Sequence, residues 1–245
     1  MLDKETVIKI IDEEISDDIV LKNEVPKNWT PIFLNIIKRL NLKKENNIIK
    51  PKPSFDELTE KLKTKSYSFI ELNNNYKEML VHNVTRINIH NFYPTLMVNN
   101  KEKWKSEVDC PEIFDVIQIC LENKDKYKNT SIYVKIKMFY NSVYGYLVSH
   151  KSNIINMRNN LISEEGRIII SELYNNFHRC FYADTDELFF NKYESDKDRV
   201  ESILKEKNLK FSTDVIEGSC LFMRKKKYIL GIKDVSETKN IIRVL

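Results

Sequence analysis

The stretch "FYADTDELFF", residues 181–190, constrains the fold of this chain more than any other. Two carboxylates, Asp184 and Asp186, stand two residues apart between apolar runs, which predicts a buried β-hairpin that presents both at one edge of a sheet. Like charges this close repel each other, and a divalent cation relieves the repulsion. Mg²⁺ prefers one or two carboxylates together with substrate phosphates, an arrangement suited to phosphoryl transfer. A solvated Asx-type turn is the alternative interpretation.

A second stretch, "KMFYNSVYG" at residues 137–145, places polar groups on one face of a predicted helix. Lys137, Asn141 and Tyr144 follow the i, i+4, i+7 spacing, so they could hold a phosphate, a base edge and a stacked base. The alternative is an amphipathic helix with an incidental polar face. Upstream, Lys124 and Lys128 have i, i+4 spacing and could bind phosphate, although such surface lysine pairs are commonplace.

A third stretch, "MRKKKY" at residues 223–228, gathers four cations ahead of Tyr228. On an alternating strand, Lys226 and Tyr228 would face one side while Lys225 and Lys227 face the other. A basic strand with an aromatic residue suits a nucleic-acid backbone. A charged edge strand that resists aggregation is the alternative.

Composition excludes several classes of protein without choosing a function. The 245 residues are 42% hydrophobic and 31% charged, with a net charge of +4 that does not require a nucleic-acid partner. No apolar run approaches the ~18 residues of a membrane span, and the charged N-terminus does not resemble a signal peptide. The four cysteines form no CxxC pair, which predicts reduced thiols. We therefore expect a cytoplasmic or other reducing intracellular compartment, viral or plasmid replication machinery included, and no membrane partner.

Hydrophobic periodicity predicts helices and strands in separate regions of the chain. Residues 1–63 favour helices, among them "PSFDELTEKLK", and three more helices are expected near residues 111–127, 132–148 and 162–177. Strands are expected at "YSFIEL", "YKEMLV" and "TRINI" within residues 66–98, in the hairpin at 181–190, and as a strand pair in "SCLFMRKKKYILGIKD".

Taken together and in order, these stretches resemble the motifs of family B DNA polymerases over about residues 84–243. "INIHNFYPT" resembles motif A, usually Asp-x-x-x-Leu-Tyr-Pro-Ser, and "KMFYNSVYG" matches motif B, Lys-x-x-x-Asn-Ser-x-Tyr-Gly. "YADTDE" resembles motif C, Tyr-Gly-Asp-Thr-Asp-Ser, with Ala183 for Gly and Glu187 for Ser. "LISEEGR" is similar to the helix after motif B, "LENKDKYK" to the first fingers helix, and "KKKY" to the Lys-x-Tyr element.

The resemblance implies an α+β fold, in which a palm with an antiparallel β-sheet carries a two-helix fingers hairpin. A small, mostly helical N-terminal segment would cover residues 1–65, and the palm would comprise residues 66–110, with motif A, and 149–245, with motif C and the Lys-x-Tyr strand. The fingers would be residues 111–148. Since about 65 residues are too few for the family's proofreading exonuclease and no thumb follows residue 245, we expect a separate chain to carry a thumb or exonuclease if the protein uses one.

The resemblance also implies roles for individual residues. Asp184, the more central Asp186 and the residue at position 88 would be catalytic and hold two Mg²⁺ ions, with Mn²⁺ as a substitute. The incoming dNTP would contact Tyr93, Asn91, Phe92, Lys124, Lys128, Lys137 and Asn141. Primer–template DNA would contact Tyr144, Gly145, Lys226, Lys227 and Tyr228.

Position 88 departs from the family, because Asn88 stands where motif A has its metal-binding Asp. An amide oxygen can ligate Mg²⁺ but brings no charge. Three explanations compete: a degenerate polymerase, a deliberate inactivating substitution, or rescue by another ligand. For rescue, His90 would share the face of Asn88, yet imidazole is a poor Mg²⁺ ligand. Glu187 is chemically better, yet on an extended strand it would point away from Asp186.

The leading hypothesis is a reduced or fragmentary family B-type DNA-directed DNA polymerase that adds deoxynucleotides to a primer 3′ end. The alternative is a catalytically inactive polymerase-derived module that binds primer–template DNA or a partner subunit. A palm-based RNA-templated enzyme is a third hypothesis, which the Asn-Ser-Val-Tyr-Gly wording of motif B disfavours.

Overall fold

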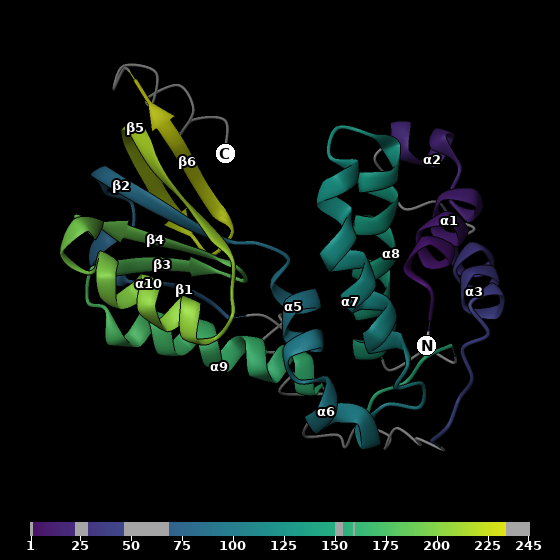
Figure 1. The fold of residues 1–245 in the computed structure, drawn as a ribbon. Coiled ribbons are helices and arrows are strands. Elements are labelled where there is room, and N and C mark those ends of the chain that lie inside the picture. The colour runs from purple at the N-terminus through teal and green to yellow at the C-terminus, as the bar shows by residue number, and fades with distance from the viewer. Residues whose placement is uncertain (1, 23–28, 47–68, 150–153, 159, 234–245) are drawn as a thin grey trace. The chain divides into compact units, whose positions relative to one another are not determined.

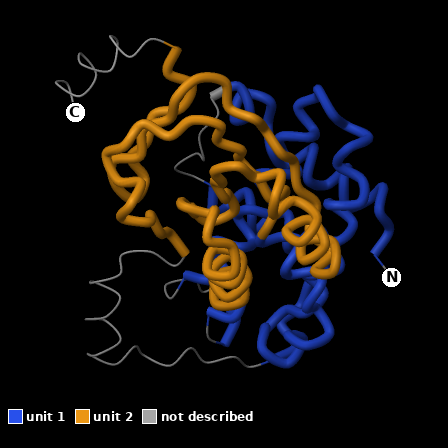
Figure 2. The backbone as a smooth tube through the Cα atoms, turned by 90° about the vertical axis from the view of Figure 1, so that its left-hand side faces the viewer, with its two compact units in different colours: residues 1–53, 93–162 blue, residues 54–92, 163–245 orange. Residues whose placement is uncertain are grey.

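The protein is described by a computed structural model, which covers residues 2–22, 29–46, 69–149, 154–158 and 160–233. The chain forms two compact units, residues 1–53 with 93–162 and residues 54–92 with 163–245 (Figure 2). These units cut across the four predicted ranges, because residues 93–110 belong with the helices rather than with the sheet.

The first unit is helical (Figure 1). Among the described residues, the predicted N-terminal helices are present. The further helix predicted at "PSFDELTEKLK" lies outside the described residues. The helices at 111–127 and 132–148 are confirmed with small shifts of their ends. The elements are α1 (Lys4–Glu14), α2 (Asp17–Lys22), α3 (Trp29–Arg39), α5 (Phe92–Asn99), α6 (Lys101–Trp104), η2 (Lys105–Glu107), α7 (Ile113–Asn123), η3 (Lys124–Tyr127) and α8 (Ser131–Val148).

Aromatic stacking joins α3 to α8 inside this unit. The Phe33 ring has no exposed surface. Its centroid lies 5.6 Å from that of Phe139 and 4.5 Å from that of Tyr146, both on α8. The hydroxyls of Thr30 and Tyr146 are 3.1 Å apart, which adds a hydrogen bond at the edge of the stack. The N-terminal helices are therefore part of the hydrophobic core that holds α8.

A buried ammonium group makes a second connection to α8. The Lys135 side chain is 5% exposed, and its Nζ lies 2.7 Å from Asp12 Oδ1 and 2.8 Å from Asp17 Oδ1. It also donates to the Asp12 carbonyl oxygen at 3.0 Å. A buried cation is tolerated only when it is paired in this way, so Lys135 fixes the end of α1 and the start of α2 against α8.

The second unit is an antiparallel six-stranded sheet in the order β1-β3-β4-β2-β5-β6, with α9 and α10 on one side (Figure 1). The predicted helix at 162–177, the hairpin at 181–190 and the last strand pair are confirmed. The elements are β1 (Ile70–Leu72), η1 (Asn74–Tyr76), β2 (Leu80–Ile89), α9 (Leu161–Asn176), β3 (Cys180–Asp184), β4 (Glu187–Asn191), η4 (Tyr193–Ser195), α10 (Lys197–Glu206), β5 (Phe211–Arg224) and β6 (Lys227–Ile232).

The strand predicted at "TRINI" is confirmed, whereas "YKEMLV" does not form a separate strand. Tyr76 ends a 3₁₀ turn, and β2 is one strand from Leu80 to Ile89. Asn83 interrupts its pairing with β5, where the register shifts between His82 and Val84. Asn83 has a φ of 55°, a conformation that asparagine adopts more readily than most residues. The residue is accommodated as a β-bulge, so the strand continues instead of turning.

Apolar side chains from all six strands pack together on one part of the sheet, and those of β6, Tyr228 and Leu230, are partly buried. The buried members of this cluster are Ile70, Val81, Val84, Phe181, Tyr182, Phe189, Cys220 and Phe222. All four cysteines are free and buried, as the sequence predicted for reduced thiols. No helix in the described part of the chain combines the length and apolar character that crossing a membrane requires.

We predict that Phe33→Ala lowers the free energy of unfolding by about 3–5 kcal/mol, because it removes a fully buried ring and leaves a cavity. Urea denaturation measures the change. Leu34→Ala is the matched control, since Leu34 is the next residue on α3 and is 44% exposed. Equal effects of the two substitutions would contradict the packing of α3 on α8.

Candidate functional site

The predicted pair of carboxylates lies on a strained hairpin, here called the carboxylate hairpin. Asp184 ends β3, Thr185 and Asp186 form the turn, and Glu187 begins β4. The Asp186 amide donates to the Asp184 carbonyl at 2.8 Å, and Thr185 between them has a φ of 63°. This is the pattern of a γ-turn with a positive central φ, a rare form that is costly for a β-branched residue. Thr185 also donates its amide to the Phe69 carbonyl at 3.0 Å, which holds the turn in place.

Tyr182 connects the carboxylate hairpin to the basic turn, which we define as Arg224–Lys227 between β5 and β6. The Tyr182 hydroxyl donates to Asp184 Oδ2 at 3.3 Å and accepts the backbone N–H of Lys226 at 2.9 Å. The same oxygen thus touches the carboxylate and the tip of the basic turn. The Asp184 carboxylate, predicted for metal binding, and the backbone of the turn predicted for DNA binding are therefore linked through one hydroxyl.

Asp186 lies where a negative charge is unfavourable. Burial raises the pKa of Asp186 to about 6, and the charges of Glu187 and Asp184 contribute to the increase. The backbone carbonyl of Asp186 accepts the amide of Ile89 at 2.9 Å, which ties the turn to the end of β2. A cation bound beside Asp184 and Asp186 would relieve this repulsion.

Asn88 lies on β2 directly opposite Glu187 on β4. Its side-chain amide donates to Glu187 Oε1 at 3.5 Å, the long limit of a hydrogen bond. The amide is therefore beside a carboxylate that the family pattern lacks. The two departures from the family, Asn88 and Glu187, face each other across one strand pair.

A guanidinium group contacts both Glu187 and Asp214. Arg86 Nη1 lies 3.4 Å from Glu187 Oε1, and Arg86 Nη2 lies 2.9 Å from Asp214 Oδ2. The Tyr228 hydroxyl donates to the other oxygen, Glu187 Oε2, at 3.3 Å. The expectation that Glu187 points away from Asp186 was wrong in its premise, since Asp186 is in the turn and the charge of Glu187 helps to raise its pKa.

The donor set fits one divalent cation better than two. Asp184 and Asp186 supply the two carboxylates that Mg²⁺ takes together with substrate phosphates. The third expected ligand, Asn88, directs its amide N–H at Glu187, which is engaged by Arg86. Within the described ranges, no three His, Cys, Asp or Glu side chains are arranged to hold a metal ion. His90, considered as a rescuing ligand, has its Nε2 3.0 Å from Ser212 Oγ.

The helical unit brings two of the predicted phosphate-binding lysines to one ring. Lys124 Nζ lies 5.4 Å and Lys137 Nζ lies 5.7 Å from the centroid of Tyr133 on α8. Lys124 is 8% exposed, whereas Lys137 is exposed. Sequence reasoning missed Tyr133, although it precedes Lys137 by four residues on the same helix face.

Two aromatic residues predicted for different ligands stack on each other in this unit. The rings of Tyr93 on α5 and Tyr144 on α8 are 4.1 Å apart and nearly parallel, at 9°. Phe92, predicted to contact the nucleotide, is 2% exposed, so that role would require its side chain to move out of the core. Asn91 lies in the preceding turn with a φ of 50°. Lys128, Asn141 and Gly145 are exposed.

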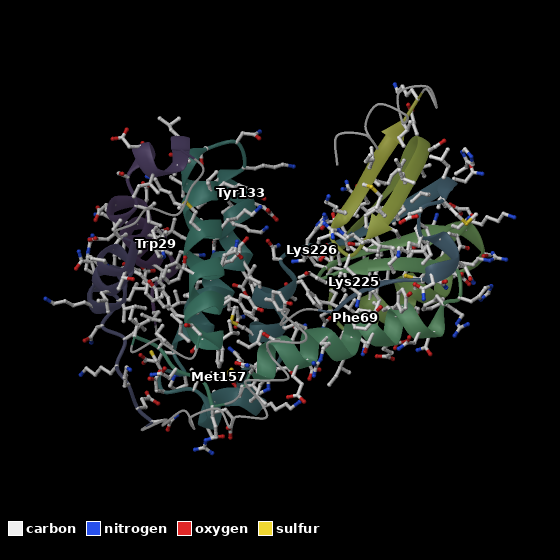
Figure 3. The ribbon with its side chains drawn as sticks, turned by 180° about the vertical axis from the view of Figure 1, so that it is seen from behind. Trp29, Phe69, Tyr133, Met157, Lys225 and Lys226 are labelled. Atoms are coloured by element: carbon white, nitrogen blue, oxygen red, sulfur yellow. The ribbon has the colours of Figure 1, made fainter. Side chains whose placement is uncertain are left out.

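The predicted alternation of the basic strand was wrong. Arg224 pairs with Lys227, so Lys225 and Lys226 form a two-residue turn instead of continuing a strand (Figure 3). Lys226 has a φ of 62° and an exposed side chain. The side chain of Lys225 forms an ion pair with Glu71, with Nζ 2.8 Å from Oε1. Lys226 thus lies at the tip of a hairpin.

Sequence comparison identifies no relative, since the chain matches no protein-family model and no curated protein. Comparison of structures finds proteins with a similar fold. The fold is similar to that of a family B DNA polymerase from the hyperthermophilic archaeon Pyrobaculum calidifontis, with a TM-score of 0.52 and 16% identity, over 81% of this chain and 30% of that one. It is also similar to Phi29 DNA polymerase complexed with primer–template DNA, with a TM-score of 0.50 and 14% identity, over 81% of this chain and 53% of that one.

These two comparisons show the fold. The predicted α+β class is confirmed, and the antiparallel sheet resembles a polymerase palm. The chain spans less than two thirds of either polymerase.

We predict that Asp186→Asn stabilises the protein more at pH 8 than at pH 4.5. The folded-state pKa of about 6 lies above the ordinary value of 3.8. Folding therefore favours the protonated carboxyl, and this contribution is lost as the pH rises through about 6. Asparagine cannot ionise, so the gain at pH 8 should be on the order of 1 kcal/mol.

Urea denaturation at both pH values measures this difference. Glu217→Gln serves as the control, because Glu217 is an exposed carboxylate on β5 of the same sheet. A stability difference for Asp186→Asn that is the same at pH 4.5 and pH 8 would contradict the raised pKa.

Proposed function

We propose that this chain is the palm-and-fingers part of a family B-type DNA-directed DNA polymerase, which binds primer–template DNA and a dNTP. The observation that carries the proposal is the junction at Tyr182, whose hydroxyl contacts both Asp184 of the carboxylate hairpin and Lys226 of the basic turn. A strained acidic turn beside a basic one serves no evident purpose in packing. It suits a DNA end that needs a cation near its reacting group and lysines near its phosphates.

The residues of the sheet unit have distinct roles in this proposal. Lys226 and Lys227 bind backbone phosphates, and Tyr228 lies near the primer end. Asp184 and Asp186 would hold Mg²⁺, or Mn²⁺. The metal would supply neutralisation of phosphate charge and activation of the primer hydroxyl. The γ-turn keeps both carboxylates at the sheet edge without rearrangement when the ligand arrives.

The residues of the helical unit bind the nucleotide in this proposal. Lys124 and Lys137 contact its phosphates, with Lys128 as a further cation. Asn141 contacts the base, and Tyr93 excludes a 2′-hydroxyl from the sugar position. The stack of Tyr93 on Tyr144 supports the last role, because a ring stacked on a neighbouring ring presents a rigid edge to the sugar.

A second function is favoured by Asn88 and its surroundings. An amide replaces the family's carboxylate, and the nearby Glu187 is engaged by Arg86. Such a chain would bind primer–template DNA or a partner subunit without catalysing transfer at an appreciable rate. DNA binding is common to both functions, and primer extension distinguishes them.

We predict that the double substitution Lys226→Ala/Lys227→Ala weakens binding to primer–template DNA of any sequence. Each lysine that contacts a phosphate releases about one counterion, so the slope of log affinity against log salt should fall by roughly two. Fluorescence anisotropy over a range of salt concentrations measures both affinity and slope.

The matched control is Lys197→Ala/Lys205→Ala, which removes two charges from α10. Their side chains are 45% and 68% exposed and form ion pairs with Glu194 and Glu201. If both double variants bind DNA like the original chain, the basic turn is only a solvated hairpin tip.

A further inference from the structure

We infer that Tyr182 is a positioning residue whose single hydroxyl holds two binding groups in place: the Asp184 carboxylate for a divalent cation and the basic turn for DNA phosphates. The inference deepens the proposed function and rests on it. It concerns only the sheet unit, in which the carboxylate hairpin and the basic turn meet at this hydroxyl.

The Tyr182 ring is held in place by its neighbours. It has no exposed surface. Aromatic pairs attract each other at centroid separations of about 4.5–7 Å, and a close-packed interior leaves a ring of this size little room to move. The hydroxyl at the end of the ring is therefore a fixed point. The centroid lies 5.5 Å, 5.2 Å and 5.3 Å from the rings of Phe189 on β4, Phe222 on β5 and Tyr228 on β6.

Backbone pairing does not connect the basic turn to the strand of Tyr182. In the order β1-β3-β4-β2-β5-β6 of the described strands, two strands separate β3 from β5. The turn is instead tied to the β1–β3 edge at both of its central residues, which are labelled in Figure 3. The Lys226 backbone N–H donates to the Tyr182 hydroxyl at 2.9 Å, and Lys225 Nζ lies 2.8 Å from Glu71 Oε1 on β1.

The bond to Tyr182 supports an unfavourable conformation at the tip of the turn. Lys226 has a φ of 62°, in the left-handed region that residues with a Cβ adopt at a cost. The hydrogen bond from its N–H offsets part of this cost. Because the bond uses the backbone, the Lys226 side chain stays exposed and is presented outward. The hydroxyl therefore fixes where the lysine begins without occupying its ammonium group.

The Asp184 carboxylate is oriented by hydrogen bonds but not saturated by them. The Tyr182 hydroxyl donates to Oδ2 at 3.3 Å, and the Thr185 hydroxyl donates to Oδ1 at 3.1 Å. A carboxylate offers about four lone-pair sites, so each oxygen retains one for a cation. The bond from Tyr182 is longer than the roughly 2.5–3.0 Å usual between two oxygens. We therefore expect it to orient the carboxylate with a modest effect on affinity.

Both hydrogen-bonding capacities of the hydroxyl are used by the two sites. A phenolic hydroxyl has one hydrogen to donate and can also accept one. Here it donates to Asp184 and accepts from Lys226. One oxygen therefore sets the separation between a cation held by Asp184 and a phosphate held by the basic turn. A primer end requires a set separation of this kind, since its last phosphates lie close to the hydroxyl that reacts.

The test replaces Tyr182 by phenylalanine in the whole chain, which removes the oxygen and keeps the ring. Two ligands are measured separately: Mn²⁺ without DNA, by electron paramagnetic resonance of the free ion, and primer–template DNA without divalent cations, by fluorescence anisotropy. Tyr182→Phe should weaken both about threefold or more, because each site loses a hydrogen bond that orders it. The Mn²⁺ binding that Asp184→Asn removes defines the cation site of the hairpin.

Tyr76→Phe is the matched control. The Tyr76 ring stacks on Phe181 in the same apolar cluster, with centroids 4.6 Å apart, but Tyr76 belongs to neither the hairpin nor the turn. The control should leave both affinities unchanged. Thermal unfolding of each variant checks that the protein remains folded.

Two further measurements distinguish positioning from a general loss of stability. In DNA binding, Tyr182→Phe should be non-additive with Lys226→Ala/Lys227→Ala, because Tyr182 acts through the basic turn. In the original chain, the Lys226 amide should exchange its hydrogen at least about tenfold more slowly than an unstructured amide. The exchange measurement needs no substitution, so it also serves if Tyr182→Phe does not fold, and an unprotected amide would overturn the inference.

The outcomes separate the inference from the proposed function. If Tyr182→Phe weakens the binding of only one ligand or of neither, Tyr182 is not a shared anchor, and the proposed function stands. Full additivity with the lysine substitutions has the same meaning. If the folded original chain fails to bind Mn²⁺ at the hairpin or fails to bind DNA, the inference fails together with that part of the proposed function.

Discussion

The pairing of β4 with β2 determines the chemistry of the carboxylate hairpin. This register sets Asn88 opposite Glu187, and it follows from β2 continuing through the bulge at Asn83 up to Ile89. A shift by one residue would turn the side chain at position 88 to the other face of the sheet. With the observed register, Asn88 places an amide beside the hairpin, where the family motif has a carboxylate. The neighbouring strand instead carries a carboxylate, that of Glu187.

The Glu187 carboxylate has a counterion in Arg86. Arg86 binds both Glu187 and Asp214, and Tyr228 and Asn88 each donate to Glu187. Glu187 is thus held by three side chains, which leaves it poorly placed to replace the missing ligand. Asp186, in contrast, is buried close to like charges and has a raised pKa. Asp184 and Asp186 therefore carry the repulsion at the hairpin, whereas Glu187 beside them shares the charge of Arg86 with Asp214.

The parts of the structure that the sequence predicted are those specified by local pattern. Apolar runs around "DTD" predicted the hairpin, and the 3.6-residue period predicted α7, α8 and α9. The backbone conformations at Asn83 and Lys226 were not predicted. A positive φ at a single residue decides between a bulge, a turn and a continuing strand, and the hydrophobic periodicity of the sequence carries no information about this angle. Tyr133 had a local indication, its spacing from Lys137, but Lys124 reaches the ring from a separate element.

The network around Asn88 could not be predicted for a different reason. Arg86 is separated from Glu187 by 101 residues and from Asp214 by 128. Their contacts depend on the order β4-β2-β5 and on the register of both pairings. The resemblance to family B polymerases did locate Asn88 and Glu187 as departures. It could not show that Asn88 and Glu187 face each other, so that together they alter the charge distribution at one place in the sheet.

The central claim, that this is a polymerase scaffold limited by its charge at position 88, is tested most directly by primer extension with Mg²⁺ or Mn²⁺. Asn88→Asp alone places two carboxylates opposite each other, which is unfavourable, so the decisive variant is Asn88→Asp/Glu187→Ser. Since ~1.4 kcal/mol of transition-state stabilisation is worth a tenfold rate and metal catalysis contributes several kcal/mol, the double variant should extend primers about a hundredfold faster than the original chain or more. Adding Asp186→Asn should abolish the gain. A double variant that binds DNA but stays inert, or an original chain that already extends primers as fast, would contradict the account.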